Sequence, residues 1–211
     1  MTKSAVKVGK SDKGQQTIVN ILAAAESLVI DEGYHNLTLR KVAGSAGLTI
    51  GNLQYYFPSK ESLIAAMFDN AIEPYLERFE EILATAGPDP EKQFIALVSL
   101  VIRDLNQRST TKFFPEVWAL ANHYGHAEEF MDAMYDKYRQ VLVDVIREVN
   151  PALSGDQSQR LALFISSSIE GHTMFIGHEK PWQQETENIV HMATASFLWL
   201  VKSDQVPGSA E

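Results

Sequence analysis

The pattern of hydrophobic and polar positions is helical along almost the whole chain. Apolar residues recur every three or four positions, and no segment alternates apolar and polar residues between turn signals as a half-buried strand would. The first helix is predicted over 14–32, and Gly33 follows as its terminator. One stripe of this helix carries Ile18, Ile21, Leu22, Ala25, Leu28 and Val29. The fold class is therefore predicted to be all-α.

Two short helices follow across a tight turn. Thr38 is positioned to cap a helix that extends to residue 46, and Thr49 to cap a second one over 50–57. Gly47 separates them, because glycine adopts the left-handed conformation that ends a helix and turns the chain sharply. Two short helices joined in this way have the design of a helix-turn-helix.

Longer helices make up the rest of the chain. Ser59 begins a fourth helix that extends to about residue 84, and Pro74 is expected to kink it by interrupting the hydrogen-bond ladder. The loop 87–90 comes next. The remaining helices are predicted at 90–107, 113–123, 127–149, 156–178 and 182–202, with breaks at Pro115, Gly125, Asn150-Pro151 and Lys180-Pro181.

This outline predicts a three-helix head followed by a larger helical body. The predicted parts are a flexible basic leader at 1–13, a helix-turn-helix DNA-binding domain at 14–58, an effector-binding and dimerisation domain at 59–204 and a frayed tail at 205–211. The leader is interpreted as solubilising, and the alternative is an arm that adds contacts to DNA phosphates or the minor groove.

The second short helix has an unusual outer face. At 100° per residue, Ile50, Leu53 and Phe57 share the face that is predicted to point inward. The opposite face carries glycine, amide and phenol side chains, whereas most surface helices carry lysine and glutamate. Amides can read adenine in the major groove, and tyrosine can reach phosphates. This face is therefore predicted to contact DNA.

The segment 38–63 resembles the TetR family of bacterial regulators. The resemblance covers roughly 15–68, and beyond residue 70 it is only architectural. It is carried by Thr38, Val42-Ala43, Ala46-Gly47-Leu48, Gly51-Asn52-Leu53, Tyr55-Tyr56-Phe57 and Lys60. Many members have histidine where this chain has Tyr56, and the substitution keeps a ring with a polar tip.

The resemblance implies a role for each matching position. Thr38 and Lys60 are expected to contact phosphates at helix N-termini, and Gly51 is expected to let the helix approach the duplex closely. The side chains expected on the groove-entering helix are Thr49, Asn52, Gln54, Tyr55 and Tyr56. For Tyr56 the alternative is packing under the fourth helix.

Charge and composition narrow the class of protein. The net charge is -9, but residues 1–62 hold seven Lys/Arg and five Asp/Glu, so the acidic charge lies in the rest of the chain. This asymmetry fits a DNA-facing end and an acidic body. The chain has no cysteine, which excludes disulfides and thiol chemistry, and it shows neither a secretory h-region nor a membrane-spanning stretch. A cytoplasmic protein is therefore expected.

The body is rich in aromatic residues and methionine, and most of them are interpreted as core. Collectively they suit an adaptable apolar cavity with a few polar anchors. The candidate pocket residues are Trp118, His123, Tyr124, Met134, Tyr135, Tyr138, His172 and Phe175. No phosphate loop, nucleophile elbow, paired carboxylates or complete metal-ligand set is present, so no catalytic residue, cofactor or metal is predicted.

The last two predicted helices each carry an apolar stripe. The resemblance implies that they pair with their symmetry mates as a four-helix bundle, and the alternative is burial within the same chain. The candidate interface residues are Leu161, Phe164, Ile165, Ile189, Ala193, Phe197 and Leu200.

Together these features predict a dimeric DNA-binding repressor, not an enzyme, released from a palindromic operator by a small apolar or aromatic effector. One alternative is an activator or a ligand-independent regulator of the same fold. Another is an all-helical ligand carrier or enzyme with an incidental helix-turn-helix, whose mark would be a buried titratable cluster.

Overall fold

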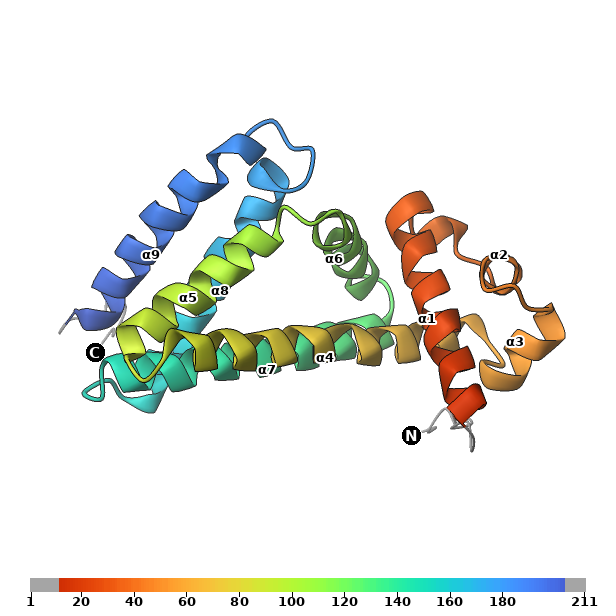
Figure 1. Ribbon diagram of the computed structural model, residues 1–211, viewed down its shortest axis with the longest axis horizontal. Helices are drawn as coiled ribbons and strands as arrows, with labels where there is room; N and C mark the ends of the chain where they lie inside the picture. Colours follow the sequence, from red (N-terminus) through yellow and green to blue (C-terminus); the bar gives the residue numbers. More distant parts are fainter. Residues whose placement is uncertain (1–11, 204–211) are drawn as a thin grey trace. The chain divides into compact units, whose positions relative to one another are not determined.

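The computed structural model describes residues 12–203, and within them every regular element is a helix (Figure 1). The leader and the tail predicted at the two ends lie, except for a few residues, outside this range. The chain packs into two compact units. One comprises the chain up to Pro74 together with Lys112–Met131, and the other comprises Tyr75–Thr111 and the chain from Asp132 onward. This division differs from the predicted boundary after residue 58, because a later segment of the chain packs with the head.

The first unit contains the predicted head. Its helices are α1 (Asp12–Glu32), the 3-10 turn η1 (Tyr34–Asn36), α2 (Leu39–Ser45) and α3 (Ile50–Tyr56), followed by the first half of α4 (Lys60–Ala86). Most of α6 (Arg108–Ala121) and the start of α7 (Gly125–Val149) complete it. The predicted stripe of α1 is buried at five of its six positions, and Leu28 is partly exposed.

Aromatic rings tie the later segment to α4 in this first unit. The ring of Phe68 on α4 stacks on that of Phe130 with centroids 4.4 Å apart, and it meets Phe113 edge-on at 6.2 Å. Such ring pairs are each worth about 0.5–1.5 kcal/mol beyond the area they bury. The head is therefore built on a segment that lies far along the sequence.

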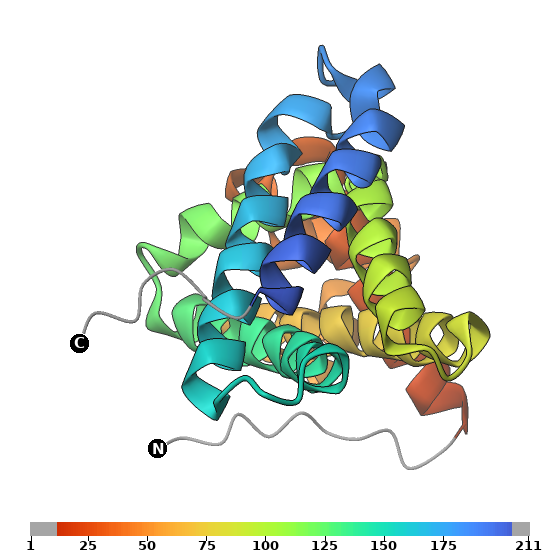
Figure 2. The same ribbon diagram turned by 90° about the vertical axis from the view of Figure 1, so that its left-hand side faces the viewer.

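The second unit is a helical body. It contains the rest of α4 and α7, together with α5 (Pro90–Asp104), α8 (Gly155–Ile176), the 3-10 turn η2 (Gln183–Glu185) and α9 (Thr186–Lys202). Figure 2 shows α8 and α9 lying side by side, and α5 packs against both. Its core is mostly aliphatic, with Leu97, Ile102, Leu142, Ile146 and Ile165 fully buried.

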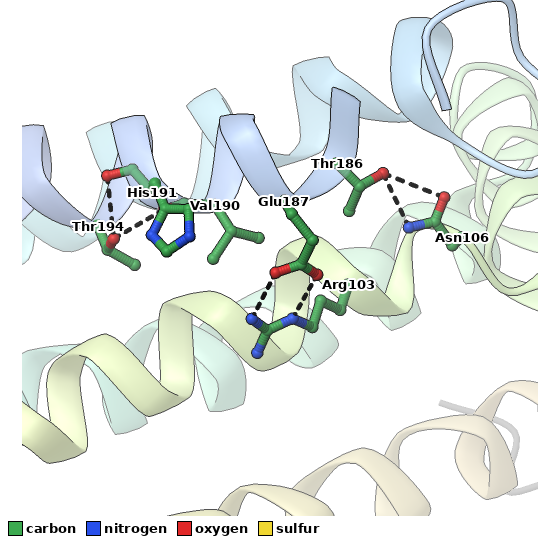
Figure 3. A network of polar contacts seen from close by, with 7 residues as sticks. All are labelled: Arg103, Asn106, Thr186, Glu187, Val190, His191 and Thr194. Atoms are coloured by element: carbon green, nitrogen blue, oxygen red, sulfur yellow. Dashed lines mark hydrogen bonds and ion pairs between the residues drawn. The ribbon is translucent and has the colours of Figure 1, made fainter. Parts of the chain in front are cut away.

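Polar contacts fix α9 against α5 in this unit (Figure 3). The guanidinium of Arg103 on α5 donates two hydrogen bonds, of 2.8 and 2.7 Å, to the carboxylate of Glu187 on α9. One turn further, the amide nitrogen of Asn106 donates to Oγ1 of Thr186 over 2.9 Å. A bidentate pair restricts geometry as well as adding energy, so the register of α9 on α5 is specified.

Two prolines lie inside helices. α6 begins at Arg108 and continues through Pro115, so the predicted break at this proline is wrong. A proline inside a helix removes one hydrogen bond, and here its neighbours Phe113 and Val117 are buried in the core of the first unit. α4 also continues through Pro74, which is the last residue of the first unit before the chain enters the second. The kink at Pro74 stays a prediction.

Candidate nucleic-acid interface

Two threonines begin the helices of the helix-turn-helix. Oγ1 of Thr38 accepts a hydrogen bond from the backbone nitrogen of Lys41 over 3.2 Å, and Oγ1 of Thr49 accepts one from Asn52 over the same distance. Each cap satisfies an N–H group that would otherwise lack a partner and is worth about 1 kcal/mol. Both predicted caps are confirmed.

The turn between the two helices requires glycine. Gly47 has a φ of +68°, a conformation that side chains with a Cβ adopt only at a cost. The backbone nitrogen of Leu48 then donates to the carbonyl of Ala43 over 2.8 Å and closes the end of α2. The angle between α2 and α3 is thus fixed by backbone geometry.

α3 is held by two anchors. Leu53 and Phe57 are fully buried in the core of the first unit, which also contains Val42 and Ala43 of α2. Ile50, predicted to point inward with them, is 38% exposed. The helix is only seven residues long, and its first turn extends past the core. The prediction for Ile50 is wrong for this reason.

The outer face of α3 carries no charged side chain. Gly51, Asn52 and Gln54 are exposed, and Tyr55 is 58% exposed. A Cβ added at Gly51 would meet nothing within 4 Å, so the packing of the chain itself does not require glycine there. Tyr56 is partly buried against the core, and its ring meets that of Tyr55 edge-on at 5.1 Å. The structure thus presents a narrow helix face with amide and phenol groups pointing outward.

Lys60 already has a partner within the chain. Its ammonium lies 4.0 Å from the centre of the Tyr34 ring and donates to the Tyr34 carbonyl over 3.4 Å. Partial burial lowers the pKa of Lys60, while the neighbouring Glu61 opposes the shift. A phosphate contact by Lys60 would have to compete with this site.

Glu116 of α6 holds the turn that leads into α2, and this role was not predicted. One carboxylate oxygen accepts a hydrogen bond from the backbone nitrogen of Tyr34 over 2.9 Å, across 82 positions of sequence. Gly33, with a φ of +78°, brings this nitrogen within reach, and the ring of Tyr124 packs near that of Tyr34 at 6.1 Å. The only available signal was an acidic residue among the aromatic residues that follow Phe113.

Comparison with known proteins identifies this head. Residues 21–67 match the family described as bacterial regulatory proteins, tetR family. The head of the chain is similar to the DNA-binding head of this family. The chain is a DNA-binding transcriptional regulator with a helix-turn-helix.

Individual relatives agree with this assignment. The chain is 28% identical over 157 residues to an uncharacterised HTH-type transcriptional regulator of Xanthobacter autotrophicus, covering 73% of this chain and 76% of the relative. It is 34% identical over 112 residues to the regulator RutR of Escherichia coli K12, where it covers 52% of this chain and about half, 53%, of the relative. A solved transcriptional regulator of Streptomyces coelicolor shares the fold, with a TM-score of 0.70 at 20% identity over 89% of this chain and 99% of the other.

The candidate effector residues of the chain are divided between the two units. Trp118, His123 and Tyr124 belong to the first unit. His123 and Tyr124 are exposed, and Tyr124 packs near Tyr34 of the head. Met134, Tyr135, Tyr138, His172 and Phe175 belong to the second unit. Phe175, expected to line a cavity, is 61% exposed.

Tyr135 and Tyr138 meet a buried polar cluster in the second unit. Tyr135 donates a hydrogen bond to the carboxyl of Glu170 on α8, and burial raises the pKa of this carboxyl to about 7. Nearby, Asp104 accepts hydrogen bonds of 2.6 Å from both Arg78 and Thr110, and Oη of Tyr75 lies 3.1 Å from Oγ1 of Thr110. The sequence prediction missed Glu170, although a lone acid next to the buried Ile169 was a signal.

The candidate interface residues of α8 and α9 are mostly core. Leu161, Ile165, Ala193 and Phe197 are buried in the aliphatic core of the second unit, and Ile189 and Leu200 pack partly against it. These predictions are corrected, because a side chain buried in its own core offers no surface to a partner. Phe164 alone of the set is largely exposed.

Other apolar residues are exposed on these two helices. The large exposed ones are Leu163, Phe164, Met174 and Phe175 on α8, and Met192 and Trp199 on α9. Both helices are apolar on two faces, which is why the stripe could not be assigned from sequence.

Two further observations bear on the other predictions. None of the helices within residues 12–203 has the length and apolarity needed to cross a membrane. Across the same part of the chain, no three histidine, cysteine or acidic side chains gather as a metal site.

Proposed function

We propose that this regulator is a dimeric repressor that binds a palindromic operator through α3 and is released by a small molecule bound in the helical body. The observation that carries the DNA-binding part is the outer face of α3. It presents exposed Asn52 and Gln54 on a helix anchored by the fully buried Leu53 and Phe57. Rigid anchoring matters because base reading depends on hydrogen-bond geometry.

The side chains of α3 limit which base pairs the operator is expected to contain. No arginine or lysine lies between Thr49 and Pro58, so the usual guanine-reading contact is missing from this helix. Asn52 and Gln54 favour adenine, and the methyl group of Thr49 suits a thymine methyl. We expect A·T pairs at the central positions of each half-site, with half-sites about one helical turn apart or a multiple of it.

Selection of bound duplexes from a random pool, at fixed salt, tests this proposal. The expected result is a palindromic motif whose central read positions are A·T. Sites that are uniformly G·C at the protected positions would contradict the assignment of α3. Placing the recovered site upstream of a reporter gene then separates repression from activation, because a repressor lowers expression and an effector restores it.

Dimerisation is assigned to the exposed apolar faces of α8 and α9. Six large apolar side chains on two neighbouring helices of one unit exceed the scattered exposure that is normal for a surface. Phe164 and Trp199 are the proposed anchors, since aromatic residues dominate the energy of interfaces. This replaces Leu161, Ile165, Ala193 and Phe197 with residues whose surfaces are accessible.

Release by an effector requires that the molecule bind one state of the dimer better than the other. The polar cluster around Glu170 supports an effector site in the second unit, because polar groups in a buried region orient ligands. Linkage requires operator DNA to weaken effector binding by the factor by which the effector weakens operator binding, typically about 5–150-fold. Titration of one effector with and without operator tests this, and equal affinities would exclude it as the switch.

A further inference from the structure

Glu170 is a carboxyl group without a cation. It is partly buried on α8, and its pKa is raised to about 7 because burial disfavours the charged form and the charge of Asp104 repels it. Tyr135 donates a hydrogen bond to it, which opposes these effects only in part. Across residues 12–203, no lysine, arginine or histidine forms an ion pair with it. The second unit therefore holds an acid that nothing in the described chain neutralises.

Asp104 shows what a neutralised acid looks like in the same unit. Arg78 donates to one of its oxygens and Thr110 to the other, each over 2.6 Å, and Oη of Tyr75 lies 3.1 Å from Oγ1 of Thr110. This network is complete within the chain, and it occupies Arg78. It stabilises the fold and leaves Glu170 as the acid whose charge is open to a ligand.

Two buried hydroxyl groups near Glu170 also lack partners. Within the described chain, Oη of Tyr138 and Oγ1 of Thr173 have no hydrogen-bond partner, although both side chains are almost fully buried. Thr173 lies three residues after Glu170, on the same face of α8. Tyr138 lies one turn after Tyr135 on α7, and Tyr135 is the residue that donates to Glu170. The charge of Glu170 also contributes to the raised pKa of Tyr138. Most buried hydroxyl groups in native proteins have a hydrogen-bond partner. Two hydroxyls without a partner, next to a carboxyl without a cation, therefore point to a ligand.

The surroundings of these three groups are aromatic and aliphatic. The ring of Phe79 lies 5.6 Å from that of Tyr138, and Ile169 and Ile176 are buried on the same helix as Glu170. Aromatic faces and a carboxylate both attract organic cations. A divalent metal would require several oxygen ligands, and the described residues bring together no group of three metal-binding side chains. An anion would be repelled by Glu170.

We propose that Glu170, Tyr138 and Thr173 bind a small organic ammonium ion with an aliphatic or aromatic body, and that such a compound is the effector. This inference rests on the proposed function. The carboxylate of Glu170 pairs with the ammonium group, and the two hydroxyls accept its remaining N–H bonds. Phe79 and the neighbouring isoleucines contact the apolar part.

Ion pairing with Glu170 gives binding a distinctive pH dependence. Below about pH 7 the acid must lose a proton before it can pair, so affinity for an ammonium rises about tenfold per pH unit and levels off above this value. Burial lowers the pKa of His172 and raises the pKa values of Tyr75 and Tyr138, so the pKa of each of these neighbours moves away from 7.

The test uses the full chain and a matched series of probes. Primary amines from butylamine to 2-phenylethylamine and tryptamine are compared with the corresponding neutral alcohols and with 3-phenylpropanoate. Thermal shift and calorimetry measure binding between pH 6 and 8, and anisotropy of a labelled operator measures release. Glu170→Gln keeps the shape and removes the charge, and Glu148→Gln makes the same change at an exposed acid of α7.

The expected result is that at least one amine binds ten times or more tightly than its alcohol, with the stated pH dependence. Glu170→Gln should abolish this preference, and Glu148→Gln should retain it. Alcohols or the carboxylate that bind and release operator as well as the amines would overturn the ammonium class and leave the proposed function intact. No response to any amine while operator binding is normal would also overturn it. So would a crystal structure at saturating amine in which only water joins Tyr138 and Thr173. Loss of operator binding by the parent chain would instead count against the proposed function.

Discussion

Replacing Glu116 with alanine should weaken DNA binding although the residue lies outside the helix-turn-helix. Its carboxylate accepts the backbone hydrogen bond of Tyr34 over 2.9 Å, and Tyr34 begins the turn that positions α2. Alanine leaves this N–H without its partner, because it removes the carboxylate that links α6 to the 3-10 turn. The head should then sample other positions relative to α6.

The magnitude follows from the type of bond. A hydrogen bond to a charged group contributes about 1.5–3 kcal/mol when well buried, and this one is partly buried, so a loss of about 1–2 kcal/mol is expected. In a chain of this size that corresponds to a decrease in Tm of roughly 2–8 °C. If the whole loss falls on the DNA-binding arrangement, operator affinity decreases by about five- to thirty-fold.

Operator anisotropy and urea unfolding measure the two effects. Glu116→Gln retains an oxygen acceptor and should lose less than half as much as the alanine variant. Glu128→Ala, an exposed acid at the start of α7, serves as the surface control. Operator affinity and Tm for Glu116→Ala that equal those of Glu128→Ala would refute the reasoning.

Three further predictions follow from individual contacts. Lys60→Ala should lower Tm, because it removes the contacts with Tyr34. In a salt titration it should change the slope of log affinity against log salt concentration by less than the one unit expected of a lysine that binds phosphate, and a change of one full unit would show that Lys60 does bind phosphate. Because the pKa of Glu170 is higher in the folded chain than its ordinary value of about 4.3, the folded state binds more protons and stability falls as pH rises from about 4.5 to 7. Glu170→Gln should therefore be more stable than the parent at pH 8, with the difference shrinking toward pH 5 in Tm measurements, and a constant difference would contradict the shift. Trp199→Glu should yield a folded monomer in sedimentation, whereas Phe197→Glu should unfold the second unit, because Phe197 is 8% exposed and Trp199 is 72% exposed; a dimer with Trp199→Glu would move the interface elsewhere.

Local signals in the sequence were sufficient to predict the helix-turn-helix of the head. Thr38, Gly47 and Thr49 act within four residues of their own positions, through caps and a left-handed turn, so their roles can be derived from neighbouring residues. Leu53 and Phe57 followed from helical period alone. The exposure of Ile50 could not be predicted in this way, because helical periodicity indicates which residues share a face and not how far along the helix the core extends.

The features that could not be predicted depend on packing between residues far apart in the sequence. Glu116 meets Tyr34 across 82 positions, and no periodicity connects two such residues. The pairing of α8 and α9 with a partner was an implication of the family resemblance. Both helices are apolar on two faces, and the sequence does not say which face the chain itself covers. Glu170 was overlooked for a related reason, because an acid in a helix is usually solvated and only the fold shows its burial.

The most direct test of the account is the specificity ratio of α3. The dissociation constant of the parent chain for its selected operator is compared with that for random DNA of the same length, at the same salt, and again for Asn52→Ala and Gln54→Ala. Each substitution should cost about 1–3 kcal/mol on the operator and far less on random DNA, because these amides read bases and do not contact phosphates. A specificity ratio unchanged in both variants would contradict the claim that α3 reads the operator.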